Sequence, residues 1–404
     1  MHTQEAHLDH NTTEHNPVVI VAGTRTPFGA FLGAFKETSA IMLGSSAIKG
    51  ALTQIDLPHT PHIDEVLGGC VLSAGLGQAP ARQAARHAGL PDATPCTTIN
   101  KVCGSSMKAT MIACQALTTQ PDNIMIALGM ENMSLAPFLM PNARTGTRYG
   151  HHTLLDHMLY DGLQDAYNQK KLMGELAEAC AERFGFSRAM QDAFALRSFE
   201  LYKKALSCNW LKNEITPVTL KNGSTISQDE TPKKVDTKKI PHLKPAFKTN
   251  GSITAGNASA IADGAAALII TRARHAHQLG IKPLAKIIGY CTHAQSPEWF
   301  TTAPATAIDK LINKIHWKIA DVNLFEINEA FSVVPMAAIK SLSLDPDKVN
   351  IHGGACTIGH PLGASGVRII VTLLHALHQH KLQRGIASLC IGGGEATAIA
   401  IERV

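Results

Sequence analysis

A cysteine at the start of a predicted helix is the first candidate for covalent chemistry. Cys103 stands in the run NKVCGSSM, a turn of small residues that leads into a helical pattern over 106–117. Free backbone N–H groups and the helix dipole favour a thiolate at such a position, and the thiolate is the nucleophilic form of cysteine. Cys103 is therefore a candidate nucleophile, although its position alone does not exclude a packing role.

A histidine on a glycine-rich turn is the second candidate. The segment 352–366 reads HGGACTIGHPLGASG, and its small residues place His360 on a stiff turn that other backbone segments can approach closely. A neutral imidazole can take the proton of a thiol and return it when its pKa lies near the working pH. His360 is thus a candidate base, while the alternative is a histidine that satisfies a buried turn.

Two further segments carry polar or reactive groups beside apolar runs. Cys390 leaves a predicted buried strand and enters a glycine turn at 392–394, whose backbone N–H groups could approach a ligand oxygen. The run EINEAF places Asn328 in an apolar segment, where buried polar side chains need hydrogen-bond partners. Asn328 is then either a residue whose hydrogen bonds stabilise the fold or a site residue. Cys390 could be a redox partner, a packing residue or a base.

Alternating strands and helices must position these groups. The predicted strands are 18–22, 123–128, 267–270, 285–288, 388–391 and 398–401, and the predicted helical stretches are 106–117, 177–204, 305–314 and 366–377. This alternation predicts a layered α/β fold. A strand, a small-residue turn, a helix and a strand follow one another around Cys103 and again around Gly363, which indicates an internal duplication.

Composition divides the chain into four parts. Residues 1–16, with four histidines, predict a disordered tail rather than a metal site. Residues 134–254 contain polar helices and a lysine-rich loop, which predict an inserted loop domain. The remainder forms one half at 17–133 plus 255–280 and a second half at 281–404.

Charge and composition disfavour several classes of function. The 404 residues carry a net charge of +5, too small for a dedicated nucleic-acid binder but compatible with an anionic metabolite. The nine cysteines include no CxxC pair, so no metal site is expected. No apolar run is long enough to span a membrane and the N-terminus lacks signal-peptide features, so we expect a cytoplasmic protein without membrane insertion.

Together these motifs resemble the thiolase family, which comprises acetyl-CoA acetyltransferases and 3-ketoacyl-CoA thiolases. The resemblance covers about residues 17–404 and rests on GTRTPFG, GQAPARQAA, GMENMS, TAGNASAIADGAAA, NEAF, GHPLGASG and CIGGG in this order. It implies a duplicated five-layer α-β-α-β-α fold with an inserted loop domain. It also implies an acyltransferase that interconverts two acyl-CoA, in the simplest case two acetyl-CoA, with a 3-ketoacyl-CoA such as acetoacetyl-CoA plus CoA.

The resemblance also implies roles for single residues. Cys103 would carry the acyl group, His360 would activate it, and Cys390 would exchange the α-proton of the second acyl-CoA. Asn328 would hold a water that, with His360, stabilises the enolate oxygen. The backbone N–H groups of Cys103 and Gly392 would form a second oxyanion hole.

Substrate contacts are implied by the same resemblance. Ser259 would contact the pantetheine arm of coenzyme A, which is a substrate rather than a permanently bound cofactor. Met173 lies on the loop that faces the acyl chain, where Leu172 replaces the histidine of many thiolases, so chain length stays open. Lysines between 233 and 248 could meet the CoA phosphates or form a solvated surface. Glu395 stands where the family often has an uncharged residue, and the sequence offers no account of it.

Two other functions share parts of this pattern. A decarboxylating ketoacyl synthase-like condensing enzyme has the nucleophilic cysteine but tends to use a second histidine or an asparagine where Cys390 stands. A noncatalytic acyl-CoA-binding protein of the same fold would be expected to have lost Cys103, His360 or Cys390. We also expect a homodimer or homotetramer, because thiolases commonly assemble in this way.

Overall fold

The computed structural model describes residues 16–57, 59, 61–168 and 171–404. The tail predicted at 1–16 therefore lies outside the described residues except for Asn16. The carbonyl of Asn16 accepts a hydrogen bond from Arg272 Nη1 at 2.7 Å. The chain thus joins the fold immediately before its first strand.

Each half of the molecule contains a sheet with the same order of pairing, two antiparallel pairs followed by parallel pairs. Antiparallel pairing of Val19 with Lys286 and of Ile20 with Ala285 joins the two into one continuous ten-stranded sheet. The strands of the first half, in spatial order, are β1 (Val18–Arg25), β10 (Ala262–Arg272), β5 (Met125–Asn132), β3 (Glu65–Gly69) and β4 (Cys96–Ile99). Those of the second half are β11 (Ala285–Ala294), β14 (Glu395–Arg403), β13 (Arg384–Ile391) and β12 (Leu324–Ile327). A parallel bridge between Phe325 and Val349 stands where the first half has β4. This correspondence confirms the predicted duplication.

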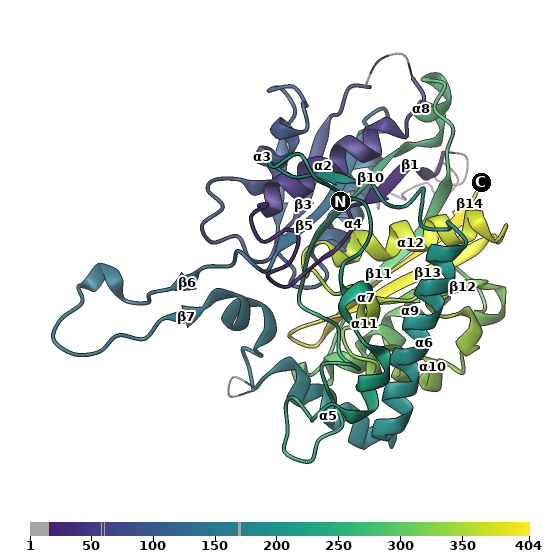
Figure 1. Cartoon of the computed structure of the whole chain (residues 1–404). Helices are drawn as coiled ribbons and strands as arrows, with labels where there is room; N and C mark the ends of the chain where they lie inside the picture. The colour runs from purple at the N-terminus through teal and green to yellow at the C-terminus, as the bar shows by residue number, and fades with distance from the viewer. Residues whose placement is uncertain (1–15, 58, 60, 169–170) are drawn as a thin grey trace, which may run out of the picture.

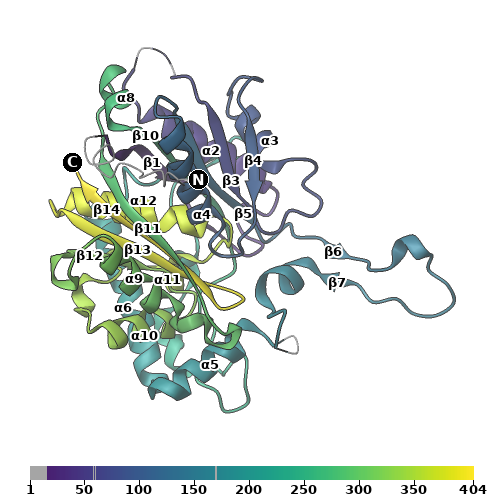
Figure 2. The ribbon, with the colours of Figure 1, turned by 180° about the vertical axis from the view of Figure 1, so that it is seen from behind.

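Helices form three layers around the two sheets (Figures 1 and 2). The central pair is α4 (Ser105–Thr119) and α12 (Ser365–Gln379), and one apolar core joins it to both sheets. The outer helices are α2 (Ala40–Thr53) and α3 (Pro80–His87) on the first half, and α9 (Ala303–Lys314) and α10 (Val333–Leu342) on the second. The five-layer α-β-α-β-α architecture is therefore confirmed.

The two central helices touch at their N-termini. A Cβ atom on Gly366 would lie 2.4 Å from Met107 N, so no side chain fits there. The backbone N–H of Val367 in α12 donates a hydrogen bond to Ser106 Oγ in α4 at 3.0 Å. Because each helix follows one of the candidate turns, this contact brings the turn of Cys103 close to the turn of His360.

The helical stretch predicted at 177–204 is two helices, α5 (Met173–Phe184) and α6 (Arg188–Ser207). Gly185 ends α5 with φ +68°, a conformation that favours glycine. Ser187 then caps α6, and its hydroxyl accepts a hydrogen bond from Met190 N at 3.2 Å. The break turns α5 toward the outer core of the second half, where Leu176 and Cys180 are buried.

The segment between β5 and β10 adds an extended arm to the two halves. Its two short strands, β6 (Phe138–Leu139) and β7 (Leu155–Asp156), pair and project away from the body (Figures 1 and 2). Apart from short 3₁₀ and π turns, the remaining elements are β2 (Gly29–Ala30), β8 (Val218–Thr219), β9 (Thr225–Ile226), α7 (Thr231–Lys234), α8 (Ala273–Gln278) and α11 (Ala355–Ile358). In the described ranges no helix is both long and apolar enough to cross a membrane. The domain boundaries at 134 and 254 stay a prediction.

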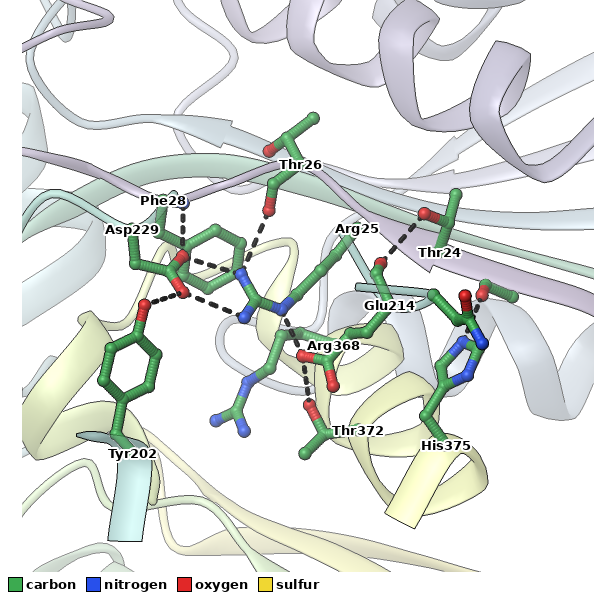
Figure 3. Close-up of polar contacts among 12 residues, drawn as sticks. Thr24, Arg25, Thr26, Phe28, Tyr202, Glu214, Asp229, Arg368, Thr372 and His375 are labelled. Carbon is green, nitrogen blue, oxygen red and sulfur yellow. Dashed lines mark hydrogen bonds and ion pairs between the residues drawn. The ribbon is translucent and has the colours of Figure 1, made fainter. Parts of the chain in front are cut away.

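A buried ion-pair cluster ties the inserted segment to both halves (Figure 3). Arg25, at the end of β1, pairs with Glu214 through Nε and donates to both carboxylate oxygens of Asp229 at 2.7 and 3.0 Å. Tyr202 of α6 donates to Asp229, and Thr372 of α12 donates to Glu214, both at 3.0 Å. Burial has the largest single effect and would raise the pKa of Glu214, but the charge and the hydrogen bond of Arg25, with smaller contributions from two histidines, together keep that pKa below its ordinary value.

We predict that Arg25→Ala lowers the free energy of unfolding by about 3–5 kcal/mol, because it leaves two buried carboxylates without their cation. Urea unfolding followed by circular dichroism measures this loss. Arg86→Ala is the matched control, since Arg86 and Asp92 form an ion pair with side chains 53% and 71% exposed. Equal stability of the two variants would show that the Arg25 cluster contributes no more than a surface pair.

Candidate active site

Cys103 occupies a strained turn between β4 and α4. Asn100 Oδ1 accepts a hydrogen bond from Val102 N at 2.9 Å, and Ser105 Oγ accepts one from Lys101 N at 2.8 Å. The turn holds Val102 at φ +46°, a left-handed conformation that is rare for a β-branched residue and costs free energy. Because α4 begins at Ser105, Cys103 lies just before the helix, close to where the sequence predicted it.

An apolar cavity of about 540 Å³ brings the candidate groups together. The predicted site residues that line it are Cys103, His360, Cys390, Gly392, Ser259 and Met173. Leu172 lines it as well, together with aromatic side chains that include Phe247 and Phe331. Segments from both halves and from the insertion therefore line the same cavity.

Burial controls the protonation of Cys103. Removal from water raises the pKa of its thiol to about 11, although the backbone N–H groups of Gly392 and of Cys103 itself act in the opposite direction. The sequence led us to expect that the helix start would lower the pKa of Cys103 and favour the thiolate. This expectation is wrong for the net pKa, because desolvation raises it by more than the N–H groups lower it. At neutral pH Cys103 is a thiol and needs a base.

His360 is placed to be that base. Its Nδ1 atom lies 2.6 Å from Ser365 Oγ, while its buried Nε2 atom has no hydrogen-bond partner among the residues that the structure describes. Burial, followed by the nearby charge of Arg368, lowers the pKa of His360 to about 3. The imidazole is thus neutral at neutral pH, and one of its nitrogens is unpaired.

The hydroxyl of Ser365 determines which nitrogen of His360 carries the proton. Ser365 Oγ donates its single hydrogen to the carbonyl of Pro361 at 2.9 Å, so it must accept from His360 Nδ1. A proton on Nδ1 leaves a lone pair on Nε2. His360 therefore has the tautomer that can accept a thiol proton at Nε2.

Arg368 fixes the amide of Asn328 beside His360. Its Nη2 donates to Asn328 Oδ1 at 2.7 Å, and its Nη1 donates to Glu326 Oε1 at 2.8 Å. With the amide oxygen occupied, the NH₂ group of Asn328 lies 3.4 Å from His360 Nδ1, and because the Nδ1 proton points to Ser365 this is a packing contact rather than a hydrogen bond. Asn328 does not line the cavity itself, so its contact is with the histidine, and its role in holding a water stays a prediction.

Cys390 lies at the end of β13, before the glycine turn into β14. Burial, followed by the proximity of Cys103, raises the pKa of the Cys390 thiol well above its ordinary value. Gly393 and Gly394 have φ values of +89° and +87°, which allow the chain to reverse directly after Gly392. The cavity therefore holds two neutral thiols, each on a different turn.

Charged groups near the cavity are few. Of the lysines that the sequence singled out between 233 and 248, Lys234 lines the cavity and pairs with Glu230 Oε1 at 2.6 Å. No group of three or more histidine, cysteine, aspartate or glutamate side chains that could hold a metal ion occurs within the described residues. Among the lining side chains that the structure describes, the two thiols and the imidazole are the candidates for covalent and proton-transfer chemistry.

Three supporting residues were missed by the sequence reasoning. Two of them, Ser365 and Arg368, hold the ring of His360 and the amide of Asn328. The third, buried Glu131, accepts hydrogen bonds from the backbone N–H groups of Val71, Leu72 and Gly363 at 2.8–3.0 Å, and so holds the loop after β3 against the turn of His360. An arginine inside the apolar run GVRIIVTLL was the available signal for Arg368.

We predict that Ser365→Ala lowers kcat by about tenfold or more with little change in KM, because the proton on His360 is no longer confined to Nδ1. Steady-state kinetics of acyl transfer measure the effect. Thr271→Val is the control, since it removes another buried hydroxyl, which donates to the carbonyl of Asn123 at 2.7 Å, without touching the site. An unchanged kcat in Ser365→Ala would contradict the tautomer assignment.

Comparisons with known proteins agree with this architecture. The models of the N-terminal and C-terminal thiolase domains match residues 18–274 and 281–403. The chain is 47% identical over 392 residues to the acetyl-CoA acetyltransferase of Schizosaccharomyces pombe, covering 96% of this chain and 99% of that protein. It is 47% identical over 394 residues to the mitochondrial acetyl-CoA acetyltransferase of Rattus norvegicus, covering 96% and 92%.

Solved structures give the same result. The Bacillus anthracis acetyl-CoA acetyltransferase matches with a TM-score of 0.93 and 37% identity over 96% of this chain and 99% of that chain. The Ascaris suum Acat5 thiolase, solved in complex with coenzyme A, matches with a TM-score of 0.90 and 40% identity over 96% of this chain and 100% of that chain.

The protein described by the present structure is an acyltransferase. It belongs to the thiolase family, and neither a ketoacyl synthase nor a noncatalytic binding protein is favoured.

Proposed function

We propose that the protein interconverts two acetyl-CoA with acetoacetyl-CoA plus CoA through an acyl group carried on Cys103. The convergence of two neutral thiols and a neutral imidazole on one apolar cavity carries this proposal. Two relatives are named acetyl-CoA acetyltransferases, which supports a two-carbon acyl group. Coenzyme A then serves as a substrate and not as a resident cofactor.

In the cleavage direction, the first step is a proton transfer from Cys103 to His360 Nε2. The new thiolate attacks the 3-keto carbon of acetoacetyl-CoA, and the backbone N–H groups of Cys103 and Gly392 stabilise the oxygen that becomes negative. The bond between carbons 2 and 3 then breaks. Its electrons pass to the enolate of acetyl-CoA, whose oxygen faces the protonated His360 and the water proposed to be held by Asn328.

Cys390 completes the cleavage. Its thiol gives a proton to carbon 2 of the enolate, which releases acetyl-CoA and leaves a Cys390 thiolate. An incoming CoA thiol returns a proton to Cys390, and its sulfur attacks the acyl group on Cys103. The departing Cys103 sulfur takes its proton back from His360, so all three groups regain their neutral forms.

The residues around the reactive groups fit a small apolar acyl group. Leu172, Met173 and Phe331 line the cavity together with Cys103, and none of their side chains has a strong hydrogen-bonding group. Ser259 lines it too, and we infer that its hydroxyl contacts the pantetheine arm. With Leu172 at the position where many thiolases have histidine, substrate selection here depends on shape rather than on a polar contact.

The arm between β5 and α5 supports self-association. Phe138 and Leu154 are 65% and 58% exposed on this projecting segment, and Tyr149 is fully exposed, which places large apolar side chains in a position to contact a partner. We infer a homodimer or homotetramer in which the arm contacts a second copy. The cytoplasmic location stays a prediction, because some relatives are mitochondrial enzymes.

We predict that the purified protein cleaves acetoacetyl-CoA with CoA and that Cys103→Ala abolishes both this reaction and the exchange of labelled CoA into acetyl-CoA. Cys390→Ala should lose cleavage but keep the exchange, because exchange needs only the acyl group on Cys103. Ultraviolet absorbance of the 3-ketoacyl thioester and a radiolabel assay measure the two reactions.

The acyl-chain length of the substrate and the separate roles of Cys103 and Cys390 are tested by different experiments. A panel of 3-ketoacyl-CoA esters from about four to sixteen carbons tests the size of the acyl pocket, and the four-carbon ester should be the best substrate. A preference for long chains would overturn the acetyl assignment and leave the reaction type intact. Full cleavage activity in Cys390→Ala would instead contradict the role of Cys390.

A further inference from the structure

A partly exposed ion pair links the two turns that carry the reactive groups. Lys101 Nζ contacts Glu395 Oε2, and the two side chains are 21% and 33% exposed. Lys101 lies two residues before Cys103, and Glu395 directly follows the glycine turn that contains Gly392. Glu395, for which the sequence offered no role, therefore has its partner on the turn at 100–104 that carries Cys103. We call this segment the cysteine turn.

Apolar contacts hold the same two turns together beneath the ion pair. A Cβ atom on Gly104 would lie 2.3 Å from Ile391 Cδ1, so the cysteine turn packs directly on the end of β13. A Cβ atom on Gly392 would lie 3.6 Å from Val102 Cγ1, an ordinary contact distance. The turns therefore touch closely but can still slide over one another, because apolar contacts have little directional preference.

We propose that the ion pair between Lys101 and Glu395 is a positioning device that fixes the spacing between the backbone N–H groups of Cys103 and Gly392. The proposal rests on the proposed function, in which these two groups stabilise the same oxygen. Both N–H groups lower the pKa of the Cys103 thiol, which is consistent with their lying near its sulfur, and Cys103 and Gly392 line the same cavity. The ion pair adds a directional contact between the turns.

The glycine turn closes the hairpin of β13 and β14, in which Ile391 pairs with Glu395, but it has few side-chain anchors of its own. Glycines at 393 and 394 have positive φ values and no side chains that could anchor the turn. Its flank at Gly394 is held by a hydrogen bond from Gln295 N to the Gly394 carbonyl at 2.9 Å. Glu395 supplies the link toward the cysteine turn. An oxyanion hole requires donors about 2.7–3.1 Å from the oxygen, so a small slide of either turn weakens one donor.

A different role for Lys101 would be to bind a phosphate of coenzyme A. The two roles predict opposite effects of removing Glu395. If Lys101 binds phosphate, loss of its carboxylate partner frees the ammonium group and lowers the KM for CoA. If the pair positions the turns, loss of either partner lowers kcat and leaves the KM for CoA unchanged.

The test compares Lys101→Met, Glu395→Gln and the exchanged pair K101E/E395K in thiolysis of acetoacetyl-CoA. Each single variant should lower kcat by roughly 3- to 10-fold, between the effect of an exposed ion pair and the loss of a whole oxyanion donor. The exchanged pair should recover most of the wild-type kcat. Glu402→Gln is the matched control, because Glu402 pairs with Arg384 at 2.9 Å at the other end of the same hairpin and should leave kcat unchanged.

Three results would overturn the proposal. These are an unchanged kcat in both single variants, a lower KM for CoA in Glu395→Gln, and an exchanged pair no more active than the singles. Thermal unfolding of each variant separates positioning from loss of fold, because a positioning effect on kcat occurs at an unchanged Tm. An inactive wild-type protein would overturn the proposed function itself, whereas an active wild type with active variants would overturn only the role of the ion pair.

Discussion

Desolvation of the reactive groups is the constraint on which the rest of the site depends. Burial raises the pKa values of both cysteine thiols and lowers that of His360, so none of the three groups is charged at neutral pH. These shifts favour a neutral thiol and imidazole over a resting thiolate and imidazolium pair. Charge appears only when a proton moves from Cys103 to Nε2, close to the backbone N–H groups that can stabilise a negatively charged oxygen.

The duplicated fold supplies the geometry for this transfer. Equivalent turns in the two halves lead into α4 and α12, and these helices meet at Gly366 and Ser106, so the nucleophile and the base converge. Interactions among neutral groups must hold the imidazole, because a strong ion pair would change its pKa. Ser365 does so by accepting from Nδ1, while Arg368 donates to Glu326 and to Asn328 and turns the amide of Asn328 toward the ring.

The sequence predicted those features that depend on local spacing. The turn at Cys103, the glycine hairpin after Cys390 and the family motifs all lie within short segments, and the duplicated order of elements follows from comparing two such segments. The net protonation of Cys103 could not be predicted in this way, because it depends on burial by distant segments. The pairing of Lys101 with Glu395 spans 294 residues and had no local signal, whereas Gly185 followed by Ser187 could have revealed the break between α5 and α6.

The pH dependence of Cys103 alkylation tests the central claim most directly. Iodoacetamide modifies thiolates, and mass spectrometry of the peptide that contains Cys103 gives its rate apart from the other cysteines. With a thiol pKa of about 11, the rate should rise about tenfold per pH unit from about pH 6 to about pH 10. A rate that is constant between about pH 6 and about pH 8 would show a resting thiolate paired with imidazolium, and would contradict the account.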